Sequence, residues 1–480
     1  MKQDLNRLAG FCVAGSCALA AAVSASAQTA AAAASAPQNL SPTEQWIKDV
    51  KHPVDWMTWG ADLRLRHEYV MNPNLTREGE RNEMNYFRFR ARVWTTLSPI
   101  EQVDFNARLT WEPRYWFKPE EEYNVYGYKG RTQQMEDFEL DEFIPDTFNV
   151  KIKPADMPLT MTIGRQDFMV GPRFEFGDGW LIGDGTPRDG SRTHYFDAAR
   201  LTFDWKDAKT VVNAIYIDQS AEEDAWLPPI NEQDFRHYVS EQDERGVILY
   251  VSNKSVEKTQ LDGFFIYSHR NAELAGGTDG DIFAFGARAE VKPTDKWTIS
   301  GQFAPEFGEL NDQDVLAFGA IANAKYSFQD SLNNSLQVGV EYLSGDDDGD
   351  DDDSNAFDPL WGRWPQWSEF LVFNTTEYGK PAYWSNLIRP NVNWSMKPFK
   401  KVDWVNDYSA LFAAESYEDR EGFDSGSFKG HLFRSMVRYT HNSHLMVRFM
   451  MDYFIPGDFY DEDVYDNDGM FTRAEIYLTF

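Results

Sequence analysis

The sequence has almost no cysteine, and it lacks long apolar stretches outside its first residues. Only two cysteines occur among 480 residues, Cys12 and Cys17. A mature chain that begins after them has no disulfide framework and no thiol for catalysis or metal binding. No later segment approaches the roughly 20 apolar residues that a membrane-spanning helix requires, and the mean hydropathy is −0.55. The sequence therefore excludes a disulfide-stapled domain and a helical membrane protein.

Basic residues are scarce relative to acidic ones. The chain has 46 Lys and Arg against 77 Asp and Glu, which gives a net charge of −31. A nucleic-acid partner requires a basic footprint on the protein, so this balance argues against nucleic-acid binding. It leaves an anionic small substrate open, because a pore lining can differ in sign from the outer surface.

The first 27 residues have the parts of an export signal. Lys2 and Arg7 form a basic start, residues 8–23 are apolar and rich in alanine, and "ASA" at 25–27 fits a cleavage site. We therefore expect a signal peptide over residues 1–27, which is removed on export. Residues 28–55 are expected to form a flexible periplasmic lead-in, with one helical turn at "SPTEQWIKDV", where Ser41 can cap the turn.

From residue 56 onward, apolar and polar residues alternate, and no helical period of any length is found. In "VDFNARLTWE" (103–112), for example, Val103 and Phe105 share one face, while Asp104 and Asn106 share the other. About eighteen such segments occur, most of them roughly 9–14 residues long, close to the length of a tilted membrane strand. Short turns alternate with long acidic loops, which lie near 70–84, 113–134, 170–191, 219–243, 344–386, 414–428 and 455–469, with modest connections at 271–279 and 307–314.

This pattern predicts an all-β fold: a transmembrane antiparallel up-and-down β-barrel of about 18 strands over residues 56–480, with short periplasmic turns and long extracellular loops. The final segment, "FTRAEIYLTF", also alternates and ends on Phe480. An amphipathic last strand with a terminal aromatic residue is what the barrel assembly machinery reads. The alternative is an exported soluble β-protein such as a propeller, but the repeat of roughly 40–50 residues typical of propellers is not found.

The segment "NYFRFRARVWTTL" (85–97) places arginines at every second position, between apolar residues. Arginine facing lipid at the bilayer midplane costs roughly 2–4 kcal/mol, so these side chains are expected to face the lumen. The same parity predicts further lumen cations, with Lys325, Arg389 and Lys397 as additions. The predicted pore-lining arginines are Arg64, Arg66, Arg88, Arg90, Arg92, Arg108, Arg288, Arg434, Arg438, Arg448 and Arg473.

Two roles are open for these arginines. Acidic residues share the same faces, so arginine–carboxylate ladders could simply brace the wall. In segment 85–97, however, the arginines have no interleaved acidic residues, which favours attraction of a carboxylate-bearing polymer through bidentate pairing.

Residues 162–205 resemble the alginate-export family of outer-membrane porins. The matching pieces are "GRQ", "GDGWLIGD" and "R-x-x-x-FDAARL", and "FDPLWGRW" (357–364) is a weaker second element. The family usually has a basic residue where Trp180 stands, so one loop contact is expected to differ. Arg165 has the parity of the lipid-facing Ile163; a bulge at Gly164 could turn it inward, or it could lie at the outer rim. The motif residues are Gly164, Arg165, Gln166, Gly177, Asp178, Gly179, Arg192, Phe196, Asp197 and Arg200.

The resemblance implies an eighteen-stranded channel of the bacterial outer membrane that passes an alginate-like polyuronate by passive, electrostatically selective diffusion. The alternative is a general or sugar-specific uptake porin for anionic oligosaccharides or other small anions. An enzymatic site is not expected. The expected partners are an anionic polysaccharide or oligosaccharide, outer-membrane lipid, lipopolysaccharide and the assembly machinery.

The acidic run "GDDDGDDDD" in the longest predicted loop is either a solvated segment or a calcium site. Oxygen ligands suit Ca²⁺, and the candidates are Asp346, Asp348 and Asp350. No other cofactor is expected.

Overall fold

The computed structural model describes residues 42–75, 83–118, 138–139, 141–170, 173–183, 195–222, 225–231, 238–274, 276–346, 352–362, 364–417, 420–465 and 467–480. The signal peptide expected over residues 1–27 lies outside this part of the chain. Strands dominate what is described. The elements are α2 (Pro42–Lys51), β1 (Met57–Met71), β2 (Glu83–Ile100), β3 (Val103–Trp111), β4 (Arg114–Lys118), β5 (Phe138–Glu139), β6 (Phe143–Ile152), β7 (Leu159–Gln166), β8 (Met169–Val170), β9 (Arg173–Phe174), η2 (Gly177–Gly179), β10 (Phe196–Trp205), β11 (Thr210–Gln219), β12 (Gln242–Asn253), β13 (Thr259–Ala272), β14 (Gly280–Val291), β15 (Trp297–Leu310), β16 (Gln313–Ser327), β17 (Ser335–Leu343), β18 (Asp353–Ser354), α3 (Phe370–Phe373), β19 (Leu387–Phe399), β20 (Val402–Phe412), β21 (Phe428–Thr440), β22 (Leu445–Pro456) and β23 (Gly469–Thr479).

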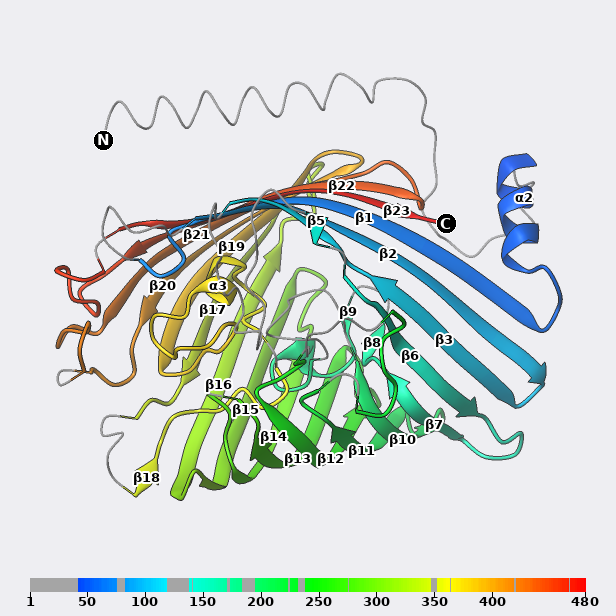
Figure 1. Cartoon of the computed structure of the whole chain (residues 1–480), viewed down its shortest axis with the longest axis horizontal. Coiled ribbons are helices and arrows are strands. Elements are labelled where there is room, and N and C mark those ends of the chain that lie inside the picture. The colour runs from blue at the N-terminus through cyan, green and yellow to red at the C-terminus, as the bar shows by residue number, and fades with distance from the viewer. Residues whose placement is uncertain are drawn as a thin grey trace.

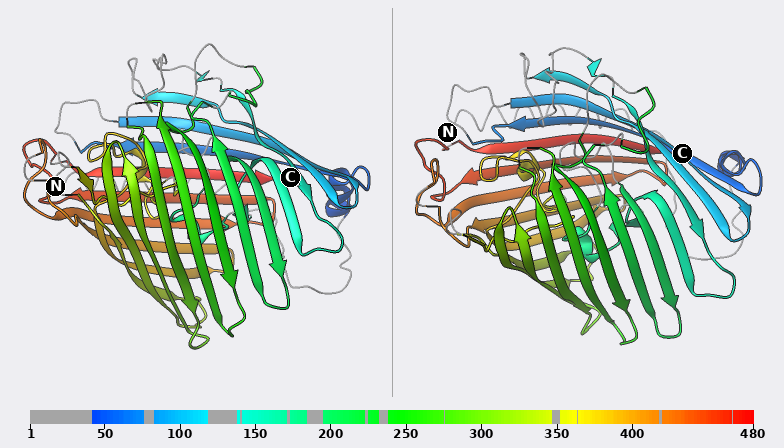
Figure 2. Two further views of the ribbon diagram at one scale, coloured as in Figure 1. Left: turned by 90° about the horizontal axis from the view of Figure 1, so that it is seen from below. Right: turned by 60° about the horizontal axis from the view of Figure 1, so that its bottom comes forward.

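Eighteen of the described strands form one closed antiparallel barrel, which confirms the predicted fold class. Each long strand pairs with the next one in the chain, and β23 pairs with β1, so that Leu63 lies opposite Leu478. Figure 1 shows this closure, with the first strand beside the last, and Figure 2 shows the strong tilt of the strands. Among the described helices, none is long and apolar enough to cross a membrane.

The two faces of the strands differ as the alternation predicts. Outward residues are apolar and exposed, such as Val93 (54 % exposed) and Phe285 (50 %), while inward Arg88 is 2 % exposed. Burial therefore follows side-chain parity: the inward arginines of β2 are buried, and inward apolar residues such as Ile248 and Ile266 join a buried apolar cluster. The exposed apolar outer face is the inverse of a soluble β-protein, because this face meets lipid.

Short and long connections alternate as expected, with one exception. The connection predicted at 307–314 is only the two-residue turn Asn311–Asp312, since β15 and β16 extend to Leu310 and from Gln313. Both turn residues have positive φ (55° and 65°), as a tight two-residue hairpin requires.

The helical turn predicted for the lead-in is present as part of α2, which packs against the end of the barrel at which the chain terminates. The ring centroids of Trp46 and Phe480 lie 6.3 Å apart, and Trp59 Nε1 donates to the Val50 carbonyl at 2.7 Å. The terminal aromatic residue is thus held by the lead-in as well as by its own strand.

Candidate functional site

The inward arginines on β1, β2 and β23 lie next to one another in three adjacent strands. The register places Arg64 opposite Arg90 and Arg66 opposite Arg88. The like charges of such a column repel one another and need anions nearby to balance them. The adjoining positions carry these anions. We call these cations the arginine ladder: Arg64, Arg66, Arg88, Arg90, Arg92 and Arg473.

Carboxylates at neighbouring positions form ion pairs with the arginines of the ladder. Arg92 Nη2 lies 2.5 Å from Asp62, and Arg88 Nε lies 2.7 Å from Glu112. Other pairs join Arg64 to Glu112, Arg66 to Glu475 and Arg473 to Glu68. The sequence argument for unopposed cations on segment 85–97 is therefore wrong at this point, because it considered one strand alone and the acids stand on the next strands.

The ladder is also largely covered. Arg64, Arg66, Arg88, Arg90 and Arg473 are each less than 9 % exposed, while the Arg92 side chain is 17 % exposed. A buried, compensated pair gives a passing solute little access. The geometry of this region therefore favours the bracing role that the sequence left open.

More accessible cations lie on β21 and β22. The Arg438 side chain is 47 % exposed and bonds Asp403 at 2.8 Å, and the Arg448 side chain is 25 % exposed and bonds Glu475 at 2.9 Å. These two arginines are direct cross-strand partners. Arg434, 18 % exposed, lies 3.6 Å from Asp452. The predicted pore-lining arginines with the greater solvent exposure therefore include those on β21 and β22.

The other predicted lumen arginines also face inward and are paired. Arg108 contacts Asp146 (2.7 Å) and Asp167 (2.8 Å). Arg288 contacts Asp178 (3.1 Å), Glu290 (3.0 Å) and Asp262 (3.3 Å).

The "GRQ" motif forms the end of β7, where burial changes sharply. Ile163 is 52 % exposed on the outer side, whereas Arg165, two residues later, is 1 % exposed. Gly164 between them has φ 117°, and a Cβ there would meet the Phe148 carbonyl at 2.4 Å. The register runs through Gly164 without a shift, so no bulge forms there, and Arg165 lies opposite Phe148, which is 53 % exposed. Arg165 thus keeps the face of Ile163 and is buried because Tyr195 and Trp226 pack against its guanidinium near the end of β7.

The contacts of Arg165 are structural. Its guanidinium bonds both oxygens of Asp197 (2.9 and 3.1 Å) and stacks 4.1 Å from the Tyr195 ring centre. Gln166 Nε2 donates to the Ala198 carbonyl at 3.0 Å. These contacts tie β7 to β10. Phe196 is fully buried in the same region, and Arg192 lies outside the described residues.

The "GDG" motif forms a turn inside the barrel. Gly177, Asp178 and Gly179 all have positive φ (53°, 59° and 80°), a run that glycine makes accessible. Side chains from several strands stabilise the turn and the residues next to it. Arg200 bonds Glu175 (2.5 and 2.7 Å), and Trp180, at the position where a basic residue was expected, donates to Glu341 at 3.1 Å.

In the longest loop, the described residues 353–354 (β18) pair with the start of β16, and the described residues from 357 onward fold into the lumen, with α3 inside the ring of strands (Figure 1). We call residues 344–386 the lumen loop. Arg270 on β13 holds Asp358 with two bonds of 2.7 Å, and Trp361 Nε1 donates to Glu244 at 2.8 Å. On the other side Lys429 bonds both oxygens of Glu377 (2.6 and 2.7 Å).

Asp452 anchors the middle of the lumen loop. One of its oxygens accepts from Glu369 N (2.6 Å), Ser368 Oγ (3.1 Å) and Phe370 N (3.2 Å). The loop also meets the GDG turn, since Trp180 stacks on Phe357 with centroids 5.4 Å apart and Gly183 N donates to the Trp361 carbonyl at 2.7 Å. Two long loops therefore join across the lumen and narrow it.

Glu369 makes the docked loop sensitive to strong acid. Burial raises the pKa of its carboxyl, but Arg473 (2.9 Å away) and Arg434 outweigh burial and lower that pKa from 4.5 to about 2. A lowered pKa stabilises the docked loop fully above pH 4.5, and this contribution is lost as the pH falls toward 2. We expect single-channel conductance to be constant from pH 7 to 5 and to change with a midpoint well below 4.5. Glu369→Gln should remove the change; an unaltered titration in that variant would contradict the assignment.

A cavity of about 310 Å³ remains open between the lumen loop, the GDG turn and the wall from β14 to β20. Its lining includes amides that the sequence reasoning missed, such as Asn391 and Asn393. Their positions, two and four residues after Arg389, mark them as inward-facing, so parity alone could have found them.

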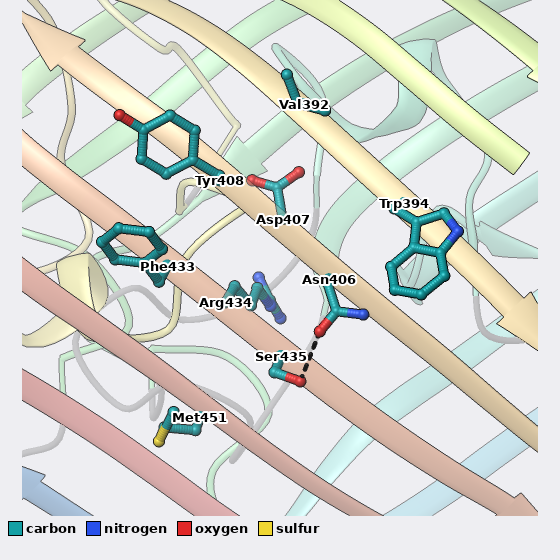
Figure 3. Close-up of a pocket in the computed structure, with 9 residues that line it drawn as sticks. All are labelled: Val392, Trp394, Asn406, Asp407, Tyr408, Phe433, Arg434, Ser435 and Met451. Atoms are coloured by element: carbon teal, nitrogen blue, oxygen red, sulfur yellow. Dashed lines mark hydrogen bonds between the residues drawn. The ribbon is translucent and has the colours of Figure 1, made fainter. Parts of the chain in front are cut away.

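A second hollow lies on the wall between β19 and β22, and Figure 3 shows its residues. The exposed side chains of Val392, Trp394 and Phe433 belong to the outward face. Ser435 Oγ donates to Asn406 Oδ1 at 3.0 Å there. Most of this hollow therefore belongs to the lipid-facing wall, while Asp407 and Arg434, which also line it, belong to the lumen face.

The acidic run of the lumen loop gives no metal centre within the described chain. There, no group of three or more His, Cys, Asp or Glu residues is placed to hold a metal ion. Asp346 is described, but Asp348 and Asp350 lie outside the described residues, so the calcium site stays a prediction.

A closed eighteen-stranded barrel with an apolar outer face and loops folded into its lumen defines a channel of the outer-membrane porin class. The family model for alginate export matches residues 55–469. Since this is most of the chain, the protein belongs to the alginate-export family, and family and fold together indicate a transporter rather than an enzyme.

Solved structures agree on the fold at low sequence identity. The chain is similar to Acinetobacter baumannii OccAB2 (12 % identity, TM-score 0.56, 88 % of this chain and 98 % of that one). It also resembles a BenF-like porin from Pseudomonas fluorescens Pf-5 (12 %, 0.53, 88 % and 98 %) and Pseudomonas aeruginosa OccK2 in complex with glucuronate (11 %, 0.51, 89 % and 98 %). No curated protein matches the sequence.

Proposed function

We propose that the protein, exported and freed of its signal peptide, passes an anionic, carboxylate-bearing polysaccharide across the outer membrane. An alginate-like polyuronate is the proposed substrate, and transport is passive, electrostatically selective diffusion. The observation that carries this proposal is the set of accessible arginines on β21 and β22. OccK2, a neighbour in fold, is described in complex with glucuronate, a single uronate.

The accessible arginines suit a moving anion better than the ladder does. Arg434 is 3.6 Å from its carboxylate partner, and Arg438 is about half exposed. A substrate carboxylate can contact Arg438 without breaking a buried pair, since its partner Asp403 is 22 % exposed. Repeated contacts of this moderate strength let a chain advance rather than stick, as conduction requires.

A second function is uptake of shorter anionic oligosaccharides. The observation that favours it is the junction of the lumen loop with the GDG turn, where Trp180 stacks on Phe357. A passage narrowed by two docked loops suits short chains entering one at a time.

The selectivity test changes the accessible charge. We expect Arg438→Gln with Arg448→Gln to lower the ratio of anion to cation permeability several-fold, because each change removes a reachable lumen charge. Reversal potentials across a planar bilayer with a salt gradient measure the ratio, and triuronate added to one side measures block.

Arg245→Gln is the matched control for this test. It removes one positive charge, half of what the double variant removes, from a side chain that is 57 % exposed and paired with Asp218 of β11 at 3.0 Å, and it should leave the ratio unchanged. A cation-selective wild type without triuronate block would contradict polyuronate passage.

A further inference from the structure

Neutral amides are the most numerous kind of side chain in the lining of the open lumen cavity. Five inward amide side chains come from β15, β16, β17 and β19, on the wall far from β1 in Figure 1. At about 310 Å³ the cavity lies at the small end of the roughly 300–1,000 Å³ range of small-molecule pockets. These amides are Gln302, Asn323, Gln337, Asn391 and Asn393.

Cross-strand pairing brings the amides together. Gln337 lies opposite Asn393, and Gln337 Nε2 donates to Asn323 Oδ1 at 3.2 Å. Gly339 stands between Asn323 and Asn391, and a Cβ at this glycine would meet Asn323 Oδ1 at 2.2 Å and Asn391 Nδ2 at 3.0 Å. The glycine thus makes room for two amides side by side. Each amide has two donor hydrogens and two acceptor lone pairs, so much of this capacity remains for a ligand.

Two tryptophans of the lumen loop line the same cavity. The indole nitrogens of Trp367 and Trp384 are buried and have no hydrogen-bond partner among the described residues. Trp384 is 6 % exposed as a whole. A buried N–H without an acceptor is unfavourable, so a ligand oxygen would be stabilised there. The Arg389 guanidinium lies 4.4 Å from the Trp367 ring centre, which fixes that ring in place.

The charges around the cavity do not favour an anion. Arg288 is paired with Asp178 at 3.1 Å and Arg389 with Glu341 at 2.9 Å. Asp407 adds a third carboxylate to the lining and accepts from Asn393 Nδ2 at 3.3 Å. Two cations against three carboxylates leave no positive excess in this cavity.

We propose that this cavity is a binding subsite for an uncharged, hydroxyl-rich sugar ring. Amides that both donate and accept match sugar hydroxyls, and the indole N–H groups add donors for ring or hydroxyl oxygens. The inference goes beyond the polyuronate proposal, since it assigns a neutral ligand to a different wall of the lumen. The two ideas can therefore fail separately.

The test uses single-channel recordings of the full-length protein with maltotriose as the neutral probe. Maltotriose should interrupt the ionic current of the wild type. Asn391→Leu with Asn393→Leu should raise the half-blocking concentration about tenfold, as expected for the loss of roughly two hydrogen bonds. Trp367→Phe, which keeps a ring but removes the N–H, should raise it by a smaller factor. Heat-modifiable gel mobility verifies that each barrel is folded.

Arg438→Gln with Arg448→Gln is the cross-control, and it should weaken triuronate block without changing maltotriose block. Absence of maltotriose block in the wild type overturns the subsite. Block that is equal in the wild type and in the folded Trp367→Phe and asparagine variants overturns it as well. Loss of triuronate block alone counts against the polyuronate proposal and leaves the subsite standing.

Discussion

Glu68→Gln should destabilise the barrel by about 3–5 kcal/mol, the usual result of removing one partner from a buried charge pair. Glu68 is fully buried and lies near three arginines: Arg473 at 2.5 Å, Arg88 at 3.5 Å and Arg66 at 3.6 Å. Glutamine has nearly the same shape, so the change removes charge and leaves packing alone. Urea unfolding of the protein in lipid vesicles, followed by tryptophan fluorescence, measures the loss.

The control is Asp403→Asn, which removes a carboxylate that also has two cationic partners, Arg438 at 2.8 Å and Lys397 at 3.1 Å. Its partners' side chains are about half exposed, so the expected change is below about 1 kcal/mol. Similar losses in the two variants would show that burial does not set the strength of the ladder, and the bracing role would then fail.

The ladder shows what alternation along a strand can and cannot predict. Lipid on one side and water on the other fix side-chain parity, which is why Arg88, Arg90 and Arg92 could be assigned to the lumen from the sequence. Their partners could not be found in the same way. Glu475 is 409 residues from Arg66 in the chain, and only barrel closure through β1 and β23 brings the two together.

The loops were harder to predict than the wall, because no period describes them. Long acidic loops rich in aromatic residues suggest an extracellular surface, yet Trp361 and Phe357 are fully buried inside the barrel. Each docking contact joins distant segments, such as Trp361 to Glu244 across 117 positions. The amides of the open cavity were missed for a different reason: their parity was readable, but neutral side chains gave no electrostatic argument to follow.

Excision of the lumen loop should raise single-channel conductance several-fold, because the loop and the GDG turn together narrow the passage. The geometry permits a clean deletion. Leu343 and Leu387 are cross-strand partners on β17 and β19, so a two-residue Asn-Gly turn can replace the intervening residues without moving either strand. Conductance in a planar bilayer measures the effect, and heat-modifiable mobility reports the fold.

Two point variants test what happens when the lumen loop loses an anchor but stays in the chain. Asp452→Ala takes away the acceptor of Glu369 N, Ser368 Oγ and Phe370 N, and Arg270→Gln breaks the pair with Asp358. Each should produce noisy current with excursions toward the conductance of the excised form, since the remaining anchors hold the loop only in part. Arg245→Gln, on the outer face, should keep the quiet wild-type level. If excision leaves conductance unchanged in a folded barrel, the lumen loop does not restrict the passage, and the narrowest point must lie along the arginine ladder instead.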